Sequence, residues 1–330
     1  MRLLVLGGTV FLGRHLVEAA LSRGHEVTLF NRGRSNPALF GDLERLTGDR
    51  DGGLEPLRGR SWDAVVDPSG YVPRVVGQSA ELLRDAAGAY VFVSTASVYS
   101  LHSSDHSEDG PVLRLDDGTS EDVTAHYGEL KALCEEVVAD HFGERALIVR
   151  SGLIVGPHDP TGRFTYWARR VARGGEVLAP GDPQREVQFI DARDQAAWIL
   201  DMLQAGRGGT FNVSGPERGL SFEQLLSRCA GPLTWVGDEF LLEQGVQPYS
   251  ELPLWVPPSA GSLLMPIERA LAAGLRCRDL DDTIRDTRAW AESLDGSPEA
   301  TDAGGRVRRP TQITAEREAD LLERWHAPGG

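Results

Sequence analysis

The stretch Met1-Arg-Leu-Leu-Val-Leu-Gly-Gly-Thr-Val-Phe-Leu-Gly13 decides the fold of this chain. Residues 2–6 form a short apolar run without helical periodicity, which predicts a fully buried strand. Glycines end that run, and apolar residues then recur at helical spacing over residues 12–21 before a second predicted strand at residues 26–30. Amides that open a helix behind a glycine turn attract a pyrophosphate. The strand–helix–strand unit therefore predicts a dinucleotide-binding site.

The loop after the second predicted strand bears on the choice of cofactor. An acidic residue at this place accepts hydrogen bonds from the ribose of NAD. This chain has Asn31, Arg32 and Arg34 instead. An arginine can pair with the 2′-phosphate of NADP, so the loop favours NADP over NAD, with a solvated basic loop as the alternative.

Further candidate residues follow the predicted strands at residues 62–67, 90–93 and 146–150, because ligands bind at the carboxyl ends of parallel strands. A short apolar stretch before Asp49 adds that residue and its neighbour Arg50, although a plain turn fits almost as well. The predicted contacts to the cofactor are Gly7, Thr9, Val10, Phe11, Leu12, Gly13, Asn31, Arg32, Arg34, Asp49, Arg50, Pro68, Ser69, Gly70, Ser94, Tyr127, Lys131 and Ser151.

Tyr127 and Lys131 open a predicted helix and lie four residues apart, so they share one helix face. A phenol with a pKa near 10 is a poor acid–base catalyst at neutral pH. An ammonium group beside it favours the phenolate and lowers that pKa. The pair is therefore a candidate for proton transfer.

The combination of residues 7–13 with Tyr127-Gly-Glu-Leu-Lys131 resembles the short-chain dehydrogenases/reductases of the extended or atypical branch. That branch includes sugar-nucleotide epimerases, dehydratases and ketone reductases, and the resemblance extends to about residue 215. It implies that Tyr127 is the general acid/base, that Lys131 is its partner, and that Thr95, four residues before Tyr99, is the third catalytic hydroxyl.

Three positions depart from the pattern of that branch or qualify it. Val10 replaces the middle glycine of the turn, and Leu153 stands where sugar-nucleotide enzymes carry an asparagine that binds the diphosphate. Arg185 resembles their phosphate-binding arginine. The candidate substrate residues are Tyr71, Ser97, Tyr99, Arg163, Trp167 and Arg185. Residues 248–266, rich in Pro and Leu, either line the substrate site or form a packed connection.

Composition limits the classes of partner. The 330 residues include 34 basic and 49 acidic side chains, which gives a net charge of −15. This charge opposes binding to nucleic acid or to an anionic membrane. The three cysteines lack metal-ligand spacing, and no apolar run reaches a membrane span. We expect a cytoplasmic monomer or homodimer with a small-molecule substrate and without a metal.

The sequence thus predicts a Rossmann-type, doubly wound parallel sheet in residues 1–215 and a smaller C-terminal mixed α/β substrate domain in residues 216–330. Segments from about 158–190 join the substrate domain, which carries a flexible linker at 295–310 and a terminal helix from Thr314. The expected function is an NADP-dependent oxidoreductase that reduces a small carbonyl or imine. One alternative is an epimerase or dehydratase of the sugar-nucleotide type with recycled NAD. Another is a non-catalytic nucleotide-sensing or RNA-binding protein on the same fold.

Overall fold

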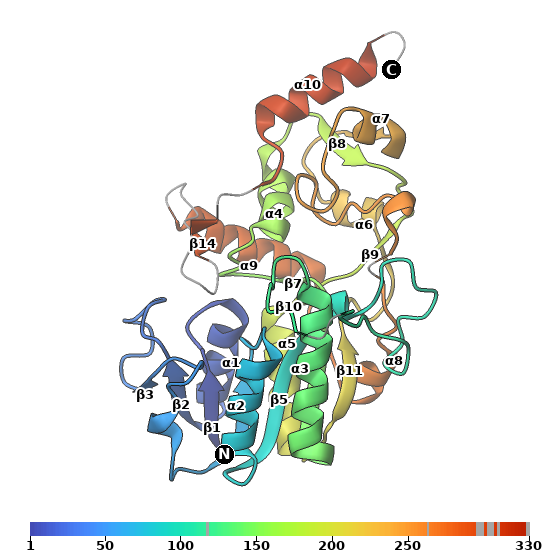
Figure 1. Cartoon of the computed structure of the whole chain (residues 1–330). Coiled ribbons are helices and arrows are strands. Elements are labelled where there is room, and N and C mark those ends of the chain that lie inside the picture. The colour runs from blue at the N-terminus through green and yellow to red at the C-terminus, as the bar shows by residue number, and fades with distance from the viewer. Residues whose placement is uncertain (117–118, 263, 295–299, 302–306, 309–310, 328–330) are drawn as a thin grey trace.

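Seven parallel strands form the central sheet (Figure 1). The computed structural model describes residues 1–116, 119–262, 264–294, 300–301, 307–308 and 311–327. Across the sheet the strand order is β11, β6, β5, β4, β1, β2 and β3. In chain order these strands are β1 (Arg2–Leu6), β2 (Glu26–Asn31), β3 (Glu44–Thr47), β4 (Trp62–Asp67), β5 (Ala87–Thr95), β6 (Ala146–Ser151) and β11 (Gly209–Val213).

The direction of winding reverses beside β1. Leu3 of β1 pairs with Val27 of β2 on one side and with Ala64 of β4 on the other. From β1 the chain runs outward through β2 and β3 and then crosses to β4 on the opposite side. Ligands of doubly wound sheets bind at the carboxyl ends of the strands near such a reversal. The predicted doubly wound parallel sheet is confirmed.

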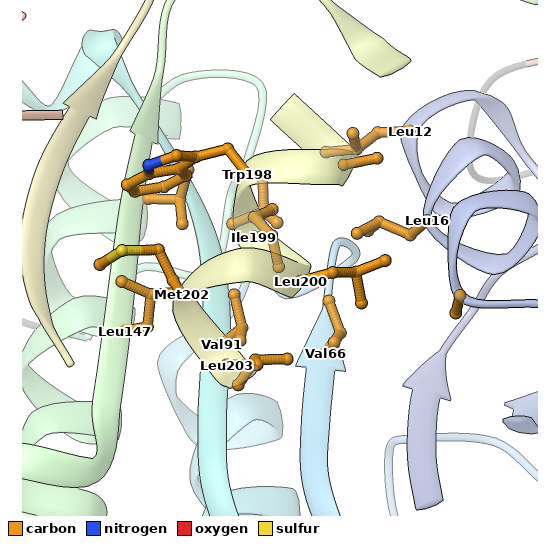
Figure 2. Packing of buried hydrophobic residues seen from close by; sticks show 14 of the residues in the cluster. Leu12, Leu16, Val66, Val91, Leu147, Trp198, Ile199, Leu200, Met202 and Leu203 are labelled. Atoms are coloured by element: carbon orange, nitrogen blue, oxygen red, sulfur yellow. The ribbon is translucent and has the colours of Figure 1, made fainter. Parts of the chain in front are cut away.

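Helices cover both faces of the sheet. Figure 2 shows one of these faces, on which Leu12 and Leu16 of one helix and Trp198 of another lie over the strand residues Val66 and Val91. All five side chains are buried, and each large one contributes about 1.5–3 kcal/mol relative to an exposed position. The helices on this face are α1 (Phe11–Ser22) and α5 (Ala192–Gln204), and those on the opposite face are α2 (Pro73–Leu83) and α3 (Tyr127–Phe142).

A second apolar cluster, called the second core below, lies beyond the carboxyl edge of the sheet (Figure 1). Trp167, Phe222 and Trp255 are completely buried in it. Short elements surround it, namely β7 (Ile154–Val155), α4 (Arg163–Arg173), β8 (Val177–Pro180), β9 (Glu186–Val187), β10 (Ile190–Asp191), β12 (Leu220–Ser221), α6 (Phe222–Leu226), β13 (Leu233–Val236), α7 (Asp238–Glu243), α9 (Leu280–Glu292) and α10 (Ala315–His326). The limits of the two predicted domains stay a prediction.

Most predicted elements are present, with one clear shift. The sequence predicts a helix over residues 78–87, whereas α2 begins five residues earlier at Pro73, a residue suited to the first helical position, and ends at Leu83. A further short helix, α8 (Glu268–Ala272), packs on β11. Most of the predicted linker 295–310 lies outside the described residues, and its described part pairs β14 (Ala300–Thr301) with β15 (Val307–Arg308). No helix in the described ranges has the length and apolarity that crossing a bilayer requires.

Candidate active site

The glycine turn after β1 has the backbone that its sequence requires. Gly7 and Gly8 have φ angles of +121° and +87°, which residues with a side chain rarely adopt. A Cβ on Gly13 would lie 3.0 Å from the Cα of Gly8, so this glycine lets α1 pack closely on the turn. Val10 precedes α1 with φ −130° and ψ 136°, in the extended region that valine favours. Glycine is therefore not needed at position 10, and the N-cap residue Val10 does not cap the amides of the first turn.

The loop after β2 folds back onto this turn. The Asn31 side chain donates to the Gly7 carbonyl at 2.9 Å and accepts from the Gly33 amide at 2.9 Å. Asn36 donates to the carbonyl of Thr9 at 2.8 Å. Asn31 thus shapes the turn, whereas the side chains of Arg32 and Arg34 are exposed beside it.

The loop after β4 flanks the glycine turn as predicted from its place at the sheet edge. Ser69 donates its hydroxyl proton to the carbonyl of Leu6 at 2.7 Å, and Pro68 lies beside Gly7. The next residue, Gly70, is packed against Phe92 so closely that a Cβ would lie 2.6 Å from that ring. The ends of β1 and β4 therefore meet at one place, next to the first turn of α1.

Tyr127 is the first residue of α3 and retains 37% of its exposure, although most core aromatics are fully buried. Its neighbour Gly128 lets the start of α3 pack closely on the turn after β5, because a Cβ on Gly128 would lie only 2.0 Å from the carbonyl oxygen of Ser97. That carbonyl belongs to η2 (Ala96–Val98), the turn that directly follows Thr95. The phenol and the end of β5 are thereby kept in contact.

The surroundings of Tyr127 shift the pKa of its phenol. Burial raises the pKa of the phenol above its usual value near 10. The hydrogen bond with the Thr95 hydroxyl and the charge of Arg163 act in the opposite direction. The phenol is therefore protonated at neutral pH, which is the form that can donate a proton.

Lys131 lies one helical turn beyond Tyr127 and is 3% exposed. Its ammonium donates to the carbonyls of Gly70 and Val93, both at 2.7 Å, and lies 3.9 Å from the centre of the Phe92 ring. Burial lowers the pKa of Lys131 to about 8. Contrary to the expectation from helical spacing, the cation that lowers the pKa of Tyr127 is Arg163, not Lys131.

Aromatic and charged side chains surround the phenol. The ring of Tyr71 lies 6.4 Å from that of Tyr127, between centroids. Arg163 opens α4, and its guanidinium lies 5.0 Å from the centre of the Tyr249 ring. The charges of Arg163 and Tyr249 both affect the pKa of Tyr127. Thr95, Tyr71 and Arg163, all predicted from the sequence, thus lie around Tyr127, with Ser97 bonded to Thr95.

Two expected cofactor residues beyond β3 have other partners. The Arg50 guanidinium pairs with the buried carboxylate of Asp67 and contacts the hydroxyls of Ser79 and Tyr90. These contacts use its donors inside the fold, so Arg50 is reassigned from the cofactor to the packing of the sheet. Asp49 is exposed, and its carboxylate closes a turn by accepting from the Asp51 amide at 3.0 Å.

A buried network accounts for three more expected site residues. Ser94 donates to the carboxylate of Glu135, which pairs with Arg150 at 2.7 Å. Tyr99 donates to Asn212 at 2.8 Å and accepts from Arg150. Ser151 separately accepts from Gln195 at 2.8 Å. Because Ser94, Tyr99 and Ser151 are buried and bonded within the protein, their predicted contacts with cofactor or substrate are corrected to structural roles.

Two expected substrate residues also belong to the second core. Trp167 is 1% exposed and donates its indole N–H to the carbonyl of Pro253 at 2.7 Å. Arg185 forms a two-pronged pair with Asp238, which also accepts from Trp255 at 2.7 Å. Leu153, at the place of the diphosphate-binding asparagine, is buried in the same core. The structure therefore does not offer the diphosphate contacts that Arg185 suggested.

Sequence reasoning missed two residues at this site. Gly128 was visible within the Tyr–Lys motif, but only the contact with Ser97 explains why a glycine stands there. Tyr249 lies in the stretch for which the sequence left two interpretations open. Tyr249 has a φ of +61°, and its ring lies against Arg163. The sequence pattern does not predict that conformation.

Comparison with known proteins places this geometry in a family. The model of the NAD dependent epimerase/dehydratase family matches residues 3–52 and 74–214, which is more than half of the chain. The chain belongs to this family. The matched ranges include the glycine turn, Thr95 and the Tyr127–Lys131 helix, so the family suspected from those motifs is confirmed.

The chain is similar in sequence to a protein named for stem-loop binding and to one named as an epimerase of UDP-glucose. A chloroplast stem-loop binding protein of 41 kDa from Arabidopsis thaliana is 27% identical over 250 residues, which cover 69% of this chain and 62% of that protein. A UDP-glucose 4-epimerase from Neisseria meningitidis is 26% identical over 168 residues, which cover 42% of this chain and 48% of that enzyme. The chain thus spans less than two thirds of the length of these relatives.

Solved structures share the fold along most of their length. The UDP-glucuronic acid 4-epimerase of Bacillus cereus, solved with NAD, has a TM-score of 0.62 at 17% identity and covers 89% of this chain and 99% of its own. The Bordetella bronchiseptica enzyme WbmG, also solved with NAD, has a TM-score of 0.64 at 20% identity and covers 89% of this chain and 94% of its own. The expected preference for NADP finds no support in these comparisons.

Proposed function

We propose that this family member is a nicotinamide-dinucleotide-dependent enzyme of the epimerase or dehydratase type, which acts on a carbon that bears a hydroxyl group. The observation that carries this proposal is the phenol of Tyr127, held beside Thr95 by the Gly128–Ser97 contact at the carboxyl edge of the sheet. The family membership and the NAD-bound structures of its relatives support it.

The residues at the glycine turn fit a dinucleotide. The N-cap residue Val10 does not cap the amides of the first turn of α1, and Gly7 has no side chain to cover the turn. Uncapped amides at a helix N-terminus suit a pyrophosphate. When bound, the cofactor would accept and return a hydride.

Tyr127 moves the proton in this scheme. Because burial raises its pKa, the phenol rests in the protonated form and donates its proton to the oxygen of a substrate carbonyl. In the opposite direction it accepts the proton of the substrate hydroxyl, and the Thr95 hydroxyl holds the oxygen during the exchange. If the same site takes and returns the proton and the hydride, the net reaction changes configuration or removes water without net oxidation.

A second candidate is the NADP-dependent reductase of a small carbonyl or imine. The exposed Arg32 and Arg34 favour it, since neither forms an ion pair within the described ranges and both stand where NAD-specific folds carry a carboxylate. The net charge of −15 supports a small-molecule substrate over nucleic acid in either case. A monomer or homodimer in the cytoplasm stays a prediction.

A fluorescence titration with NADH and NADPH decides between the two candidates. We expect tighter binding of NADH, or NAD retained through purification, under the main proposal. An Arg32→Glu variant should then change the affinity for NADH by less than about twofold. A clear preference for NADPH that is lost in Arg32→Glu would select the reductase. If the protein binds neither nucleotide, both candidates fail.

A further inference from the structure

We propose that Arg163 anchors a carboxylate of the substrate beside Tyr127. This inference rests on the proposed function and adds to it a class of substrate, a hydroxy or oxo acid. It draws on the contacts that Arg163 makes and on those that it lacks.

The surroundings of Arg163 fix its guanidinium while leaving donors open. One face lies over the ring of Tyr249, with 5.0 Å between the guanidinium carbon and the ring centre. Its Nε donates to the hydroxyl of Thr161 at 3.1 Å. Among the described residues, neither terminal nitrogen donates a hydrogen bond, and no carboxylate oxygen forms an ion pair with it within 4 Å. A stacked and tethered guanidinium with a free edge is preorganised for two-pronged recognition of an anion.

A nearby carboxylate is kept from neutralising this cation. Asp159 is buried, and its charge interacts with that of Arg163. However, its oxygens accept from the amide of Thr161 at 2.8 Å and from the Thr161 hydroxyl at 2.7 and 2.9 Å. Thr161 therefore stands between the two charges. Arg50 and Arg185, by contrast, each grip a carboxylate directly.

Arg163 lies near Tyr127. Its guanidinium is stacked on the ring of Tyr249, and both residues are close enough to Tyr127 to act electrostatically on the phenol, an interaction that falls off with distance. In this proposal, the anion bound at Arg163 belongs to the same substrate molecule as the oxygen that Tyr127 protonates.

The local charge favours a carboxylate over a phosphate. One guanidinium balances one negative charge, and it lies near Asp159, whose burial raises the pKa of that carboxyl and disfavours further negative charge. A phosphate monoester, with a charge near −2 at neutral pH, would leave an unbalanced charge close to Asp159. The planar carboxylate also matches the planar fork of the guanidinium.

Matched probe molecules test this inference on the full chain loaded with NAD. The probes are secondary hydroxy acids of four to six carbons with the hydroxyl at position 2, 3 or 4, their amides, and glycerol 2-phosphate as the phosphate control. Binding is measured by calorimetry, and turnover by chiral chromatography and mass spectrometry, which detect inversion at the hydroxyl carbon or loss of water. We expect at least one acid to bind at least tenfold more tightly than its amide.

Variants assign that preference to Arg163. Arg163→Gln should raise the KM for the acid at least tenfold and lower its kcat less, with Arg163→Lys in between. The control is Arg169→Gln on the same helix, whose guanidinium donates to the Ala291 carbonyl at 2.8 Å, and it should keep the preference. Equal binding of acid and amide, preference for the phosphate, or a preference that survives in Arg163→Gln would overturn the proposal.

A last comparison separates this inference from the proposed function. Tyr127→Phe should keep the affinity for the acid, because the phenol is not its anchor. If acids bind through Arg163 and none is inverted or dehydrated, the anchor stands and the proposed reaction fails. If acids are inverted or dehydrated without any dependence on Arg163, the reaction stands and the anchor fails.

Discussion

The central sheet and the second core are built in different ways. The sheet has strands of four to nine residues in a continuous parallel ladder. The second core is held by strands as short as two residues, by tryptophans whose N–H groups donate to a backbone carbonyl and a carboxylate, and by ion pairs such as Arg170–Glu318. The edge of the sheet supplies Thr95 and Tyr127, whereas Arg163 and Tyr249 come from the segments around the second core. Under the two proposals above, reaction chemistry and substrate choice have separate structural origins.

The largest expected effect is on the sheet side of this division. Tyr127→Phe should lower kcat by about 10²–10⁴-fold, because it removes the proton donor and leaves the surrounding packing intact. Titration with NADH should give an unchanged dissociation constant, since the glycine turn is untouched. Turnover equal to that of the natural protein would show that another group moves the proton.

The next effect concerns the stability of the second core. Glu318 is 2% exposed and pairs with Arg170 and Arg173. Glu318→Gln should lower the free energy of unfolding by about 3–5 kcal/mol, because it leaves the buried Arg170 without its counter-charge. Urea unfolding measures the change, and the exposed Glu323 on the same helix provides the control variant Glu323→Gln. A loss below about 1 kcal/mol would mean that the ion pair adds little to this core.

Two glycine substitutions test how closely the sheet region is packed. Gly128→Ala would place a Cβ 2.0 Å from the Ser97 carbonyl, so α3 must move and we expect a loss of about 1–3 kcal/mol together with activity. Gly77→Ala, in α2, would place its Cβ an ordinary 3.6 Å from Val137, so it should gain up to about 1 kcal/mol from helix propensity. Thermal unfolding that shifts both variants in the same direction would contradict this contact geometry.

The smallest effect is a dependence of stability on pH. The pKa of Lys131 falls from 10.5 to about 8 on folding, so between these values the unfolded chain holds a proton that the folded chain has released. The contribution of this group to stability is therefore fully present above 10.5 and is lost as the pH falls toward 8. Relative to Lys131→Met, the natural protein should gain up to about 1 kcal/mol in free energy of unfolding per pH unit from 8 to 10. Urea unfolding with a constant difference between the two proteins would contradict the lowered pKa.

The sequence predicts the sheet region far better than the site around it. Short apolar runs such as residues 62–67 predict buried strands directly. The motif residues Thr95 and Tyr127 meet because Thr95 ends a strand at the edge of the sheet against which the start of α3 packs. Arg50 and Arg185 were misjudged because their carboxylate partners lie 17 and 53 residues away, where one sequence shows no pairing. The orientation of Tyr249 depends on one backbone angle, and local propensity does not encode it.

The position of β11 in the sheet has a consequence for synthesis of the chain. All six residues of β6 are buried, and one edge of this strand pairs with β11, which comes after the segments of α4, β8 and α5. At ~5–20 residues per second, a ribosome exposes β6 for on the order of several seconds before its partner emerges. During that interval β6 is an unprotected apolar edge that other nascent chains can join. Truncations that end between β6 and β11 should therefore aggregate, whereas the completed chain closes that edge itself.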